Sequence, residues 1–132
     1  MNGQNNALGR HLVVEYYNCD PVLLEEPEQL ERWMKEACRL MRATIVESCF
    51  HHFNPWGVSG TIIIAESHFS VHTWPEYHYA AVDLFTCGDI EPWDGFFYLT
   101  EQLKAEHTES FEMNRGSRRK IERMMERGIG EK

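Results

Sequence analysis

The stretch that decides the fold is Thr61-Ile62-Ile63-Ile64-Ala65-Glu66-Ser67-His68-Phe69-Ser70-Val71-His72-Thr73-Trp74-Pro75-Glu76. Its opening run, residues 61–64, is β-branched throughout, which is typical of a strand. Residues 67–73 then alternate between the two faces of a strand, with Ser67, Phe69, Val71 and Thr73 on one and His68, Ser70 and His72 on the other. A serine directly after a glutamate therefore lies in a region predicted as β-structure, with two histidines on one face.

The rest of the chain supplies further elements of both kinds. Pro27 can open a helix, and apolar residues recur at helical spacing from there to about residue 42. A second helix is predicted to begin at Pro92. Further strands are predicted over residues 10–17, 43–53, 79–86 and 110–113. Residues 115–127 form a charged tail for which the sequence leaves two alternatives, a helix and a disordered segment. Short connections between successive strands favour an α+β fold: a two-layer α/β sandwich with an antiparallel sheet and both helices on one face.

Length and composition predict one domain over residues 1–112 and a basic tail over residues 113–132. The tail holds seven of the 13 Lys and Arg residues and three of the 21 acidic residues, so residues 1–112 carry a net charge of −12. Such an acidic body argues against nucleic-acid binding and suits a cationic substrate. No run of residues is long and apolar enough for a membrane span or a signal peptide, which favours a cytoplasmic location without a membrane partner.

The four cysteines form no C-x-x-C pair and are expected to be free thiols. Cys38 and Cys49 are expected to be small buried hydrophobic residues. Trp56 and Trp74 are expected to be packing residues.

Four segments resemble the bacterial and archaeal S-adenosylmethionine decarboxylases, which generate their own pyruvoyl group by self-cleavage. The resemblance covers roughly residues 8–90 and is carried by residues 8–15 with Cys19-Asp20, by residues 53–60, by the block from Glu66 to Glu76, and by residues 79–88. It implies cleavage between Glu66 and Ser67 into residues 1–66 and 67–132. It also implies a covalent pyruvoyl cofactor made from Ser67, and a homodimer of cleaved protomers whose sheets pack face to face.

The chemistry of these residues is consistent with that expectation. The Ser67 hydroxyl can attack the Glu66 carbonyl, which converts the amide into an ester, and loss of the Ser67 α-proton then releases the Glu66 carboxylate. By resemblance, Ser59 and His72 are the processing residues. A hydroxyl can stabilise the oxyanion, and a histidine can act as a base near neutral pH.

The resemblance also assigns the residues of the later reaction. A pyruvoyl group forms a Schiff base with the α-amine of S-adenosylmethionine and accepts the electrons left by carbon dioxide. Cys87 corresponds to the proton donor of the family. Phe53 and Glu76 correspond to substrate-binding positions, where a ring can stack on adenine and a carboxylate can accept hydrogen bonds from ribose. The product would supply aminopropyl groups for spermidine synthesis.

Three alternatives stay open at the level of sequence. A relative of the same fold could decarboxylate arginine or ornithine with the same pyruvoyl chemistry. A metal protein could use ligands drawn from the set His51, His52, His68, His72, His78 and Cys87. The strand-like alternation argues against such a site, and no metal is expected. A regulator that never cleaves itself is the third.

Overall fold

The computed structural model describes residues 6–87 and 89–130, with side chains described through residue 128. Residues 1–5, Gly88 and the last two residues of the expected basic tail lie outside the described part. The elements follow in the order β1 (Ala7–Tyr17), η2 (Pro21–Leu24), α1 (Pro27–Met41), β2 (Ile45–His52), β3 (Val58–Ile64), β4 (Ser67–Trp74), η3 (Pro75–Tyr77), β5 (Tyr79–Thr86), α2 (Pro92–Leu103), β6 (His107–Ser117) and α3 (Arg118–Gly130).

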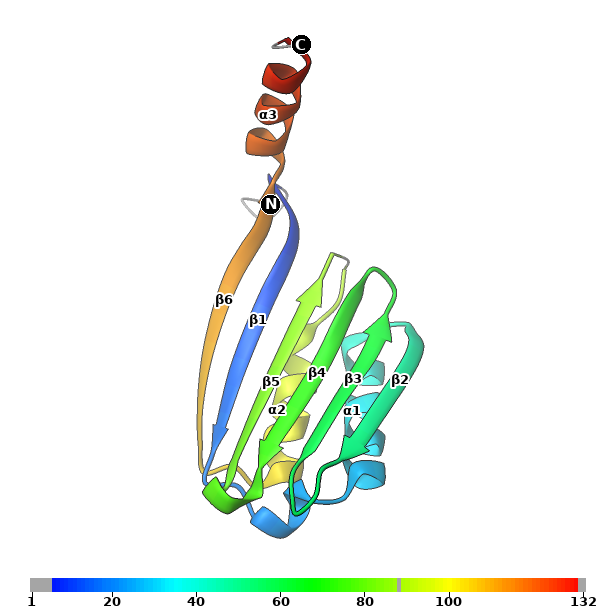
Figure 1. The fold of residues 1–132 in the computed structure, drawn as a ribbon, viewed down its shortest axis with the longest axis vertical. Helices are drawn as coiled ribbons and strands as arrows, with labels where there is room; N and C mark the ends of the chain where they lie inside the picture. Colours follow the sequence, from blue (N-terminus) through cyan, green and yellow to red (C-terminus); the bar gives the residue numbers. More distant parts are fainter. Residues whose placement is uncertain (1–5, 88, 131–132) are drawn as a thin grey trace.

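The strands form one antiparallel sheet in the order β2-β3-β4-β5-β1-β6. Helices α1 and α2 lie side by side on one face of this sheet (Figure 1). The predicted sheet with both of these helices on one face is therefore confirmed. The third helix, α3, continues from β6 beyond the sheet and does not join that layer (Figure 1).

The core lies between the sheet and the two helices. In β1, β3, β4 and β5 alternate residues point into it, including Leu12, Phe69 and Leu84, and the helices contribute Met34 and Phe96. The alternation predicted for residues 67–73 is observed, because Phe69, Val71 and Thr73 are buried whereas His72 is exposed. The opposite face of the sheet carries no helix in the described part of the chain, and we call it the open face.

The two ends of the sheet carry different residues, and we call them the Ser67 end and the Trp74 end after the first and last residues of β4. At the Ser67 end lie the turn before β4, the end of β5 at Thr86, the start of β1 and the start of α3 (Figure 1). At the Trp74 end lie η2, η3, the end of β2 and the start of β6. The sheet therefore has two chemically distinct ends separated by the length of a strand.

Several sequence predictions need correction. The last strand is not confined to residues 110–113 but runs for 11 residues, because β6 pairs with β1 along its whole length. The boundary expected at residue 112 thus falls inside β6, and part of the charged tail is the helix α3. Cys49 lies on β2 and is exposed, because its side chain points away from the helices. Cys38 is buried as predicted. Trp56 and Trp74 are exposed in the protomer, and Trp74 packs against Tyr79 with ring centroids 5.4 Å apart.

No helix in the described part of the chain is long and apolar enough to cross a membrane.

Candidate active site

The bond between Glu66 and Ser67 lies in the tight connection between β3 and β4. Ile64 pairs with Ser67, so Ala65 and Glu66 alone make the turn. Glu66 adopts a left-handed backbone conformation with φ of 64°, which is unfavourable for a residue with a side chain. The Ser67 hydroxyl donates a hydrogen bond of 3.2 Å to the carbonyl oxygen of Ala65. The serine and the carbonyl that it would attack are thus held in a strained, partly exposed turn.

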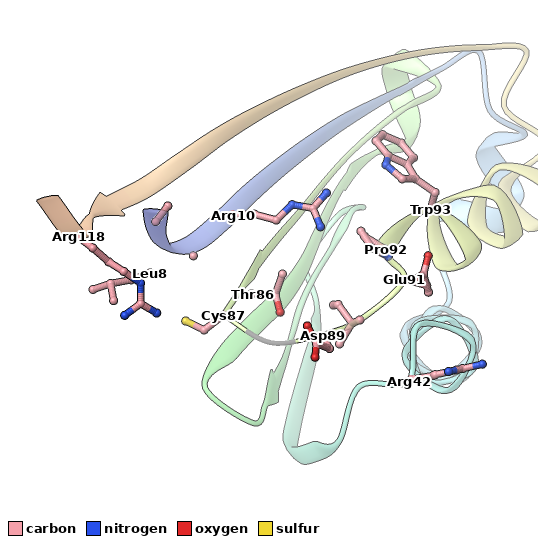
Figure 2. Close-up of a pocket in the computed structure, with 13 residues that line it drawn as sticks. Leu8, Arg10, Arg42, Thr86, Cys87, Asp89, Glu91, Pro92, Trp93 and Arg118 are labelled. Atoms are coloured by element: carbon pink, nitrogen blue, oxygen red, sulfur yellow. The ribbon is translucent and has the colours of Figure 1, made fainter. Parts of the chain in front are cut away.

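Cys87 lies beside this turn at the same end of the sheet. The register of β4 and β5 pairs His68 with Phe85, so continuing it places Thr86 opposite Ser67 and Cys87 opposite Glu66. Cys87 lines a cavity of about 630 Å³ whose wall also includes Arg10, Trp93 and Arg118 (Figure 2). Glu66 lines a second pocket of about 230 Å³ that shares Thr86 with the first. The structure therefore brings the cleavage turn and the expected proton donor together.

Ser59 and His72 form a second group, nearer the middle of the open face. They occupy paired positions on β3 and β4, and Ser59 Oγ lies 2.7 Å from His72 Nδ1. The two expected processing residues therefore contact each other directly. They do not contact Ser67, because five residues of extended strand separate His72 from Ser67, a distance of about 16 Å.

The expected substrate-binding residues lie still further away, at the Trp74 end. Phe53 follows β2, is half exposed, and packs edge-on against His51 with ring centroids 4.6 Å apart. Glu76 lies exposed in η3, two residues beyond the end of β4. Since β4 alone spans about 23 Å from Ser67 to Trp74, neither residue can reach the Ser67 of its own protomer.

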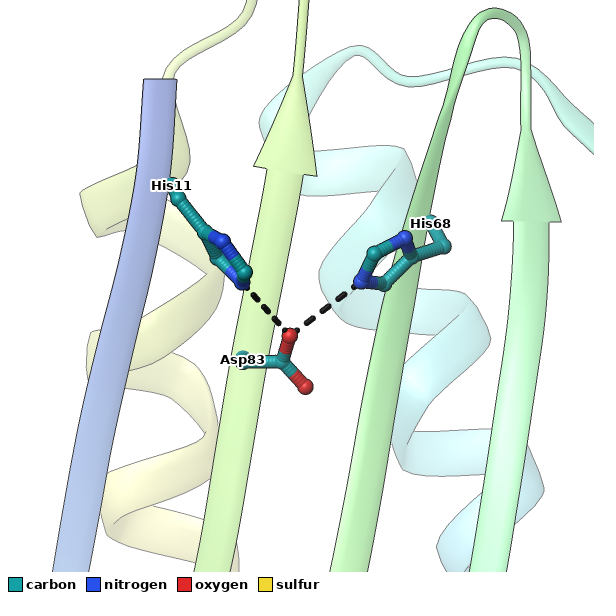
Figure 3. Close-up of side chains that lie close together, drawn as sticks. All are labelled: His11, His68 and Asp83. Atoms are coloured by element: carbon teal, nitrogen blue, oxygen red, sulfur yellow. Dashed lines mark hydrogen bonds and ion pairs between the residues drawn. The ribbon is translucent and has the colours of Figure 1, made fainter. Parts of the chain in front are cut away.

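A third group of polar side chains, which the sequence did not single out, lies on the open face near the Ser67 end. Asp83 Oδ2 lies 2.8 Å from His11 Nε2 and 3.2 Å from His68 Nε2 (Figure 3). Arg115 lies 3.1 Å from His11 Nδ1. Because an arginine can only donate, His11 Nδ1 must accept, and its Nε2–H then donates to Asp83.

This third group bears on the metal hypothesis. Among the described residues, His11, His68 and Asp83 are the potential ligands that lie close enough to share an ion. A metal on His11 Nε2 would require a proton on Nδ1, where the guanidinium of Arg115 now donates. The group is better described as a hydrogen-bonded network. Of the ligands considered from the sequence only His68 belongs to it, since His51 and His78 lie at the Trp74 end.

The buried cysteines contrast with Cys87. Burial raises the pKa of Cys19 to about 11 and that of Cys38 to about 12, so both thiols are protonated and unreactive at neutral pH. Cys49 and Cys87 are the exposed cysteines. Cys87 alone among the four combines exposure with a place beside the cleavage turn.

Comparisons with known proteins agree on one family. A family model described as S-adenosylmethionine decarboxylase matches residues 10–116. The S-adenosylmethionine decarboxylase proenzyme of Thermosipho africanus is 52% identical over 111 residues, which cover 83% of this chain and 85% of the relative. The proenzyme of the same name from Caldanaerobacter subterraneus subsp. tengcongensis is 51% identical over 112 residues, covering 84% and 90%.

Solved structures show the same similarity. The crystal structure of the adenosylmethionine decarboxylase from Aquifex aeolicus superposes with a TM-score of 0.76 at 29% identity, covering 84% of this chain and 92% of that one. The crystal structure of the Trypanosoma brucei AdoMetDC-delta26 monomer shares only the fold, with a TM-score of 0.59 at 14% identity. The match covers 76% of this chain and 44% of that one. The names of these relatives favour S-adenosylmethionine over arginine or ornithine as the substrate class.

Proposed function

Because the chain belongs to the S-adenosylmethionine decarboxylase family, we propose that it cleaves itself between Glu66 and Ser67 and then decarboxylates S-adenosylmethionine. The observation that carries this proposal is the strained turn at Glu66, which lies at the same end of the sheet as Cys87. A serine in such a turn needs little movement to attack the preceding carbonyl. Glu66 and Cys87 each line a pocket, and the two pockets share Thr86, so there is open space on both sides of that strand end.

The self-cleavage balances with the residues of the chain and one water. Ser67 Oγ attacks the Glu66 carbonyl carbon, and the amide becomes an ester as nitrogen takes the proton. A base removes the Ser67 α-proton, the Cβ–O bond breaks, and Glu66 leaves as a free carboxylate. Water then hydrolyses the resulting dehydroalanine to pyruvoyl and ammonia. Glu66 thus becomes the end of one fragment and Ser67 the blocked start of the other.

We infer from the distances within one protomer that the base comes from a second copy of the chain. Ser59 and His72 are bonded to each other but lie about 16 Å from the Ser67 of the same protomer. Two protomers that pack their open faces around a two-fold axis perpendicular to the strands would place the Ser67 end of one over the Trp74 end of the other. Each composite site would then combine Ser67 and Cys87 from one chain with residues of its partner.

Within such a site each residue has a role that its chemistry permits. The Ser59 hydroxyl can donate to the oxyanion that forms on Glu66, and His72 can take the α-proton. Phe53 can stack on adenine, and Glu76 can accept hydrogen bonds from the ribose hydroxyls.

Decarboxylation uses the same composite site. The pyruvoyl ketone would supply an electron sink when carbon dioxide departs. Cys87 then delivers a proton to the α-carbon, a role that suits an exposed thiol held at the mouth of a cavity (Figure 2). The acidic body of the chain favours the approach of a sulfonium substrate. We place the enzyme in the cytoplasm, where its product would feed spermidine synthesis.

Denaturing intact-mass spectrometry of freshly purified protein tests the first half of the proposal. Two fragments divided between Glu66 and Ser67, the second blocked at its start and lighter by the loss of ammonia, are the expected result. Carbon dioxide release from S-adenosylmethionine, but not from arginine or ornithine, tests the second half. A single uncut mass after long incubation would overturn the proposal and favour a regulator that never cleaves itself.

A further inference from the structure

Helix α3 presents an apolar face that its own protomer leaves uncovered. Ile121, Met124 and Met125 are 36%, 56% and 61% exposed, and their spacing places them on one side of the helix. The helix projects from the Ser67 end of the sheet, and its main contacts are with β6 (Figure 1). An isolated helix of 13 residues is marginally stable in water, so this one requires a surface to pack against.

The charge of α3 indicates what kind of surface that is. Its described side chains include the two acids Glu122 and Glu126 and five bases, namely Arg118, Arg119, Lys120, Arg123 and Arg127. Residues 1–112 carry a net charge of −12. A basic helix with an apolar stripe is complementary to an acidic surface with exposed apolar groups, and this chain has one.

That surface is the Trp74 end of the sheet. Val22 and Tyr77 are 72% and 75% exposed there, next to the exposed rings of Trp56 and Trp74. Three segments at this end, residues 18–29, 52–58 and 74–79, contain no Lys or Arg, and their five acids are Asp20, Glu25, Glu26, Glu28 and Glu76. The turn before β6 at the same end adds one base, Lys104, and one acid, Glu106. Apolar exposure and negative charge thus coincide on one end of the molecule.

We infer that α3 docks on the Trp74 end of a second copy of this chain and so closes the composite active site. The inference rests on the proposed dimer, in which the Ser67 end of one protomer lies over the Trp74 end of the other. Helix α3 leaves the sheet at that Ser67 end, where Arg118 already lines the cavity that holds Cys87 (Figure 2). Its apolar face would cover the end of the partner that carries Phe53 and Glu76, and the bases that flank this face, Arg118 and Lys120, would meet the acids there.

Cross-linking of isotopically mixed dimers tests the contact. Dimers containing one ¹⁴N and one ¹⁵N chain are treated with a carbodiimide, which joins an amine to a carboxylate that it touches. Cross-links between Lys120 of one isotope and the acids Glu25 to Glu28 or Glu76 of the other are the expected product. Same-isotope cross-links only would mean that α3 folds back on its own chain, and would overturn the inference, as would the absence of any cross-link to that end.

Variants test whether the contact holds the dimer together. Met124→Glu with Met125→Glu should weaken dimerisation at least tenfold in sedimentation equilibrium. The control pair Arg119→Gln and Arg123→Gln makes the same change in net charge as the methionine pair, but on the opposite side of the helix. It should weaken dimerisation less than threefold. Equal effects of the two pairs would refute docking through the apolar face. Binding of the wild-type chain to anionic vesicles with loss of the Lys120 cross-links would assign α3 to a lipid surface instead.

Failure of this inference differs from failure of the proposed site. If the Met124 and Met125 changes leave the dimer intact while Ser67 is still cleaved with the help of a partner, only the docking of α3 is wrong. If wild-type protein is a cleaved monomer, the composite site itself is wrong.

Discussion

Mixing two inactive variants should restore self-cleavage if the processing residues act across a dimer. Ser67→Ala removes the nucleophile, and His72→Ala removes the expected base. In one protomer these positions lie about 16 Å apart along a single strand, whereas proton transfer requires hydrogen-bond contact of about 3 Å. A β-strand inside a sheet cannot fold to close that gap. A site built from the Ser67 of one chain and the His72 of its partner can.

The size of the effect follows from counting dimers. When both variants are co-expressed in equal amounts, about half of the dimers contain one chain of each kind, and each of these has one site with both residues intact. The intact Ser67 belongs to the His72→Ala chain, so about half of those chains should be cut and none of the Ser67→Ala chains. Tags of different mass on the two chains let denaturing mass spectrometry read both fractions from one sample.

The controls and the refuting outcomes are equally definite. Each variant expressed alone should stay uncut, and His107→Ala, an exposed histidine at the start of β6, should be cut fully. Uncut His72→Ala chains in a sample that demonstrably contains mixed dimers would refute action across the dimer. Cleavage of His72→Ala on its own would show that another residue is the base.

Four further outcomes follow from the structure. Ser59→Ala should slow cleavage by about 10²- to 10³-fold in a processing time course, since it removes a donor to the oxyanion, and should leave the fold unchanged by circular dichroism. Cys87→Ser should be cleaved normally yet lose about 10²-fold or more in carbon dioxide release, because only the later step needs its proton. Thr73→Val should lower the free energy of unfolding by about 1–3 kcal/mol in urea titrations, because the buried hydroxyl donates to one backbone carbonyl at 2.8 Å and accepts from a backbone N–H at 2.8 Å. Burial raises the pKa of Cys19 to about 11 and that of Cys38 to about 12, whereas a thiol in the unfolded chain has a pKa near 9. The stability that depends on the protonated thiols is therefore complete below pH 9 and should be lost as the pH rises from 9 to 12, at up to about 1.4 kcal/mol per pH unit for each thiol. Replacing both cysteines with alanine should flatten that dependence, and an unchanged slope would show that other groups cause it.

Local patterns were sufficient to predict most of the elements. The start of α1 at Pro27 follows from the preference of proline for the first turn of a helix, and the alternation in residues 67–73 predicts which side of β4 is buried. The true length of β6 was missed because its residues are exposed along the whole strand and alternate in polarity only around Phe111 and Met113. Its pairing with β1 defines it, and a pairing between residues so distant in sequence leaves no local pattern.

The arrangement of the candidate site residues could not be predicted from the sequence. The family resemblance named Ser59, Ser67, His72 and Cys87 without indicating that they divide into two groups. That division depends on strand register, which pairs Ser59 with His72 and places Cys87 opposite Glu66. The network of His11, His68 and Asp83 was missed for the same reason, because its members come from three strands.

The division of the site also accounts for the open face of the sheet. A sheet covered by helices on one side only must either be polar on the other side or find a partner for it. The open face carries the polar pair of Ser59 and His72, the exposed ring of Trp74 two residues from His72, and the exposed ring of Phe111 on the edge strand β6. Under the proposed function these polar residues would act only when a second sheet covers them, and the exposed apolar residues of the same face favour such cover. Self-cleavage would then depend on assembly, since a lone protomer holds the serine and the base at a distance that its own strands keep fixed.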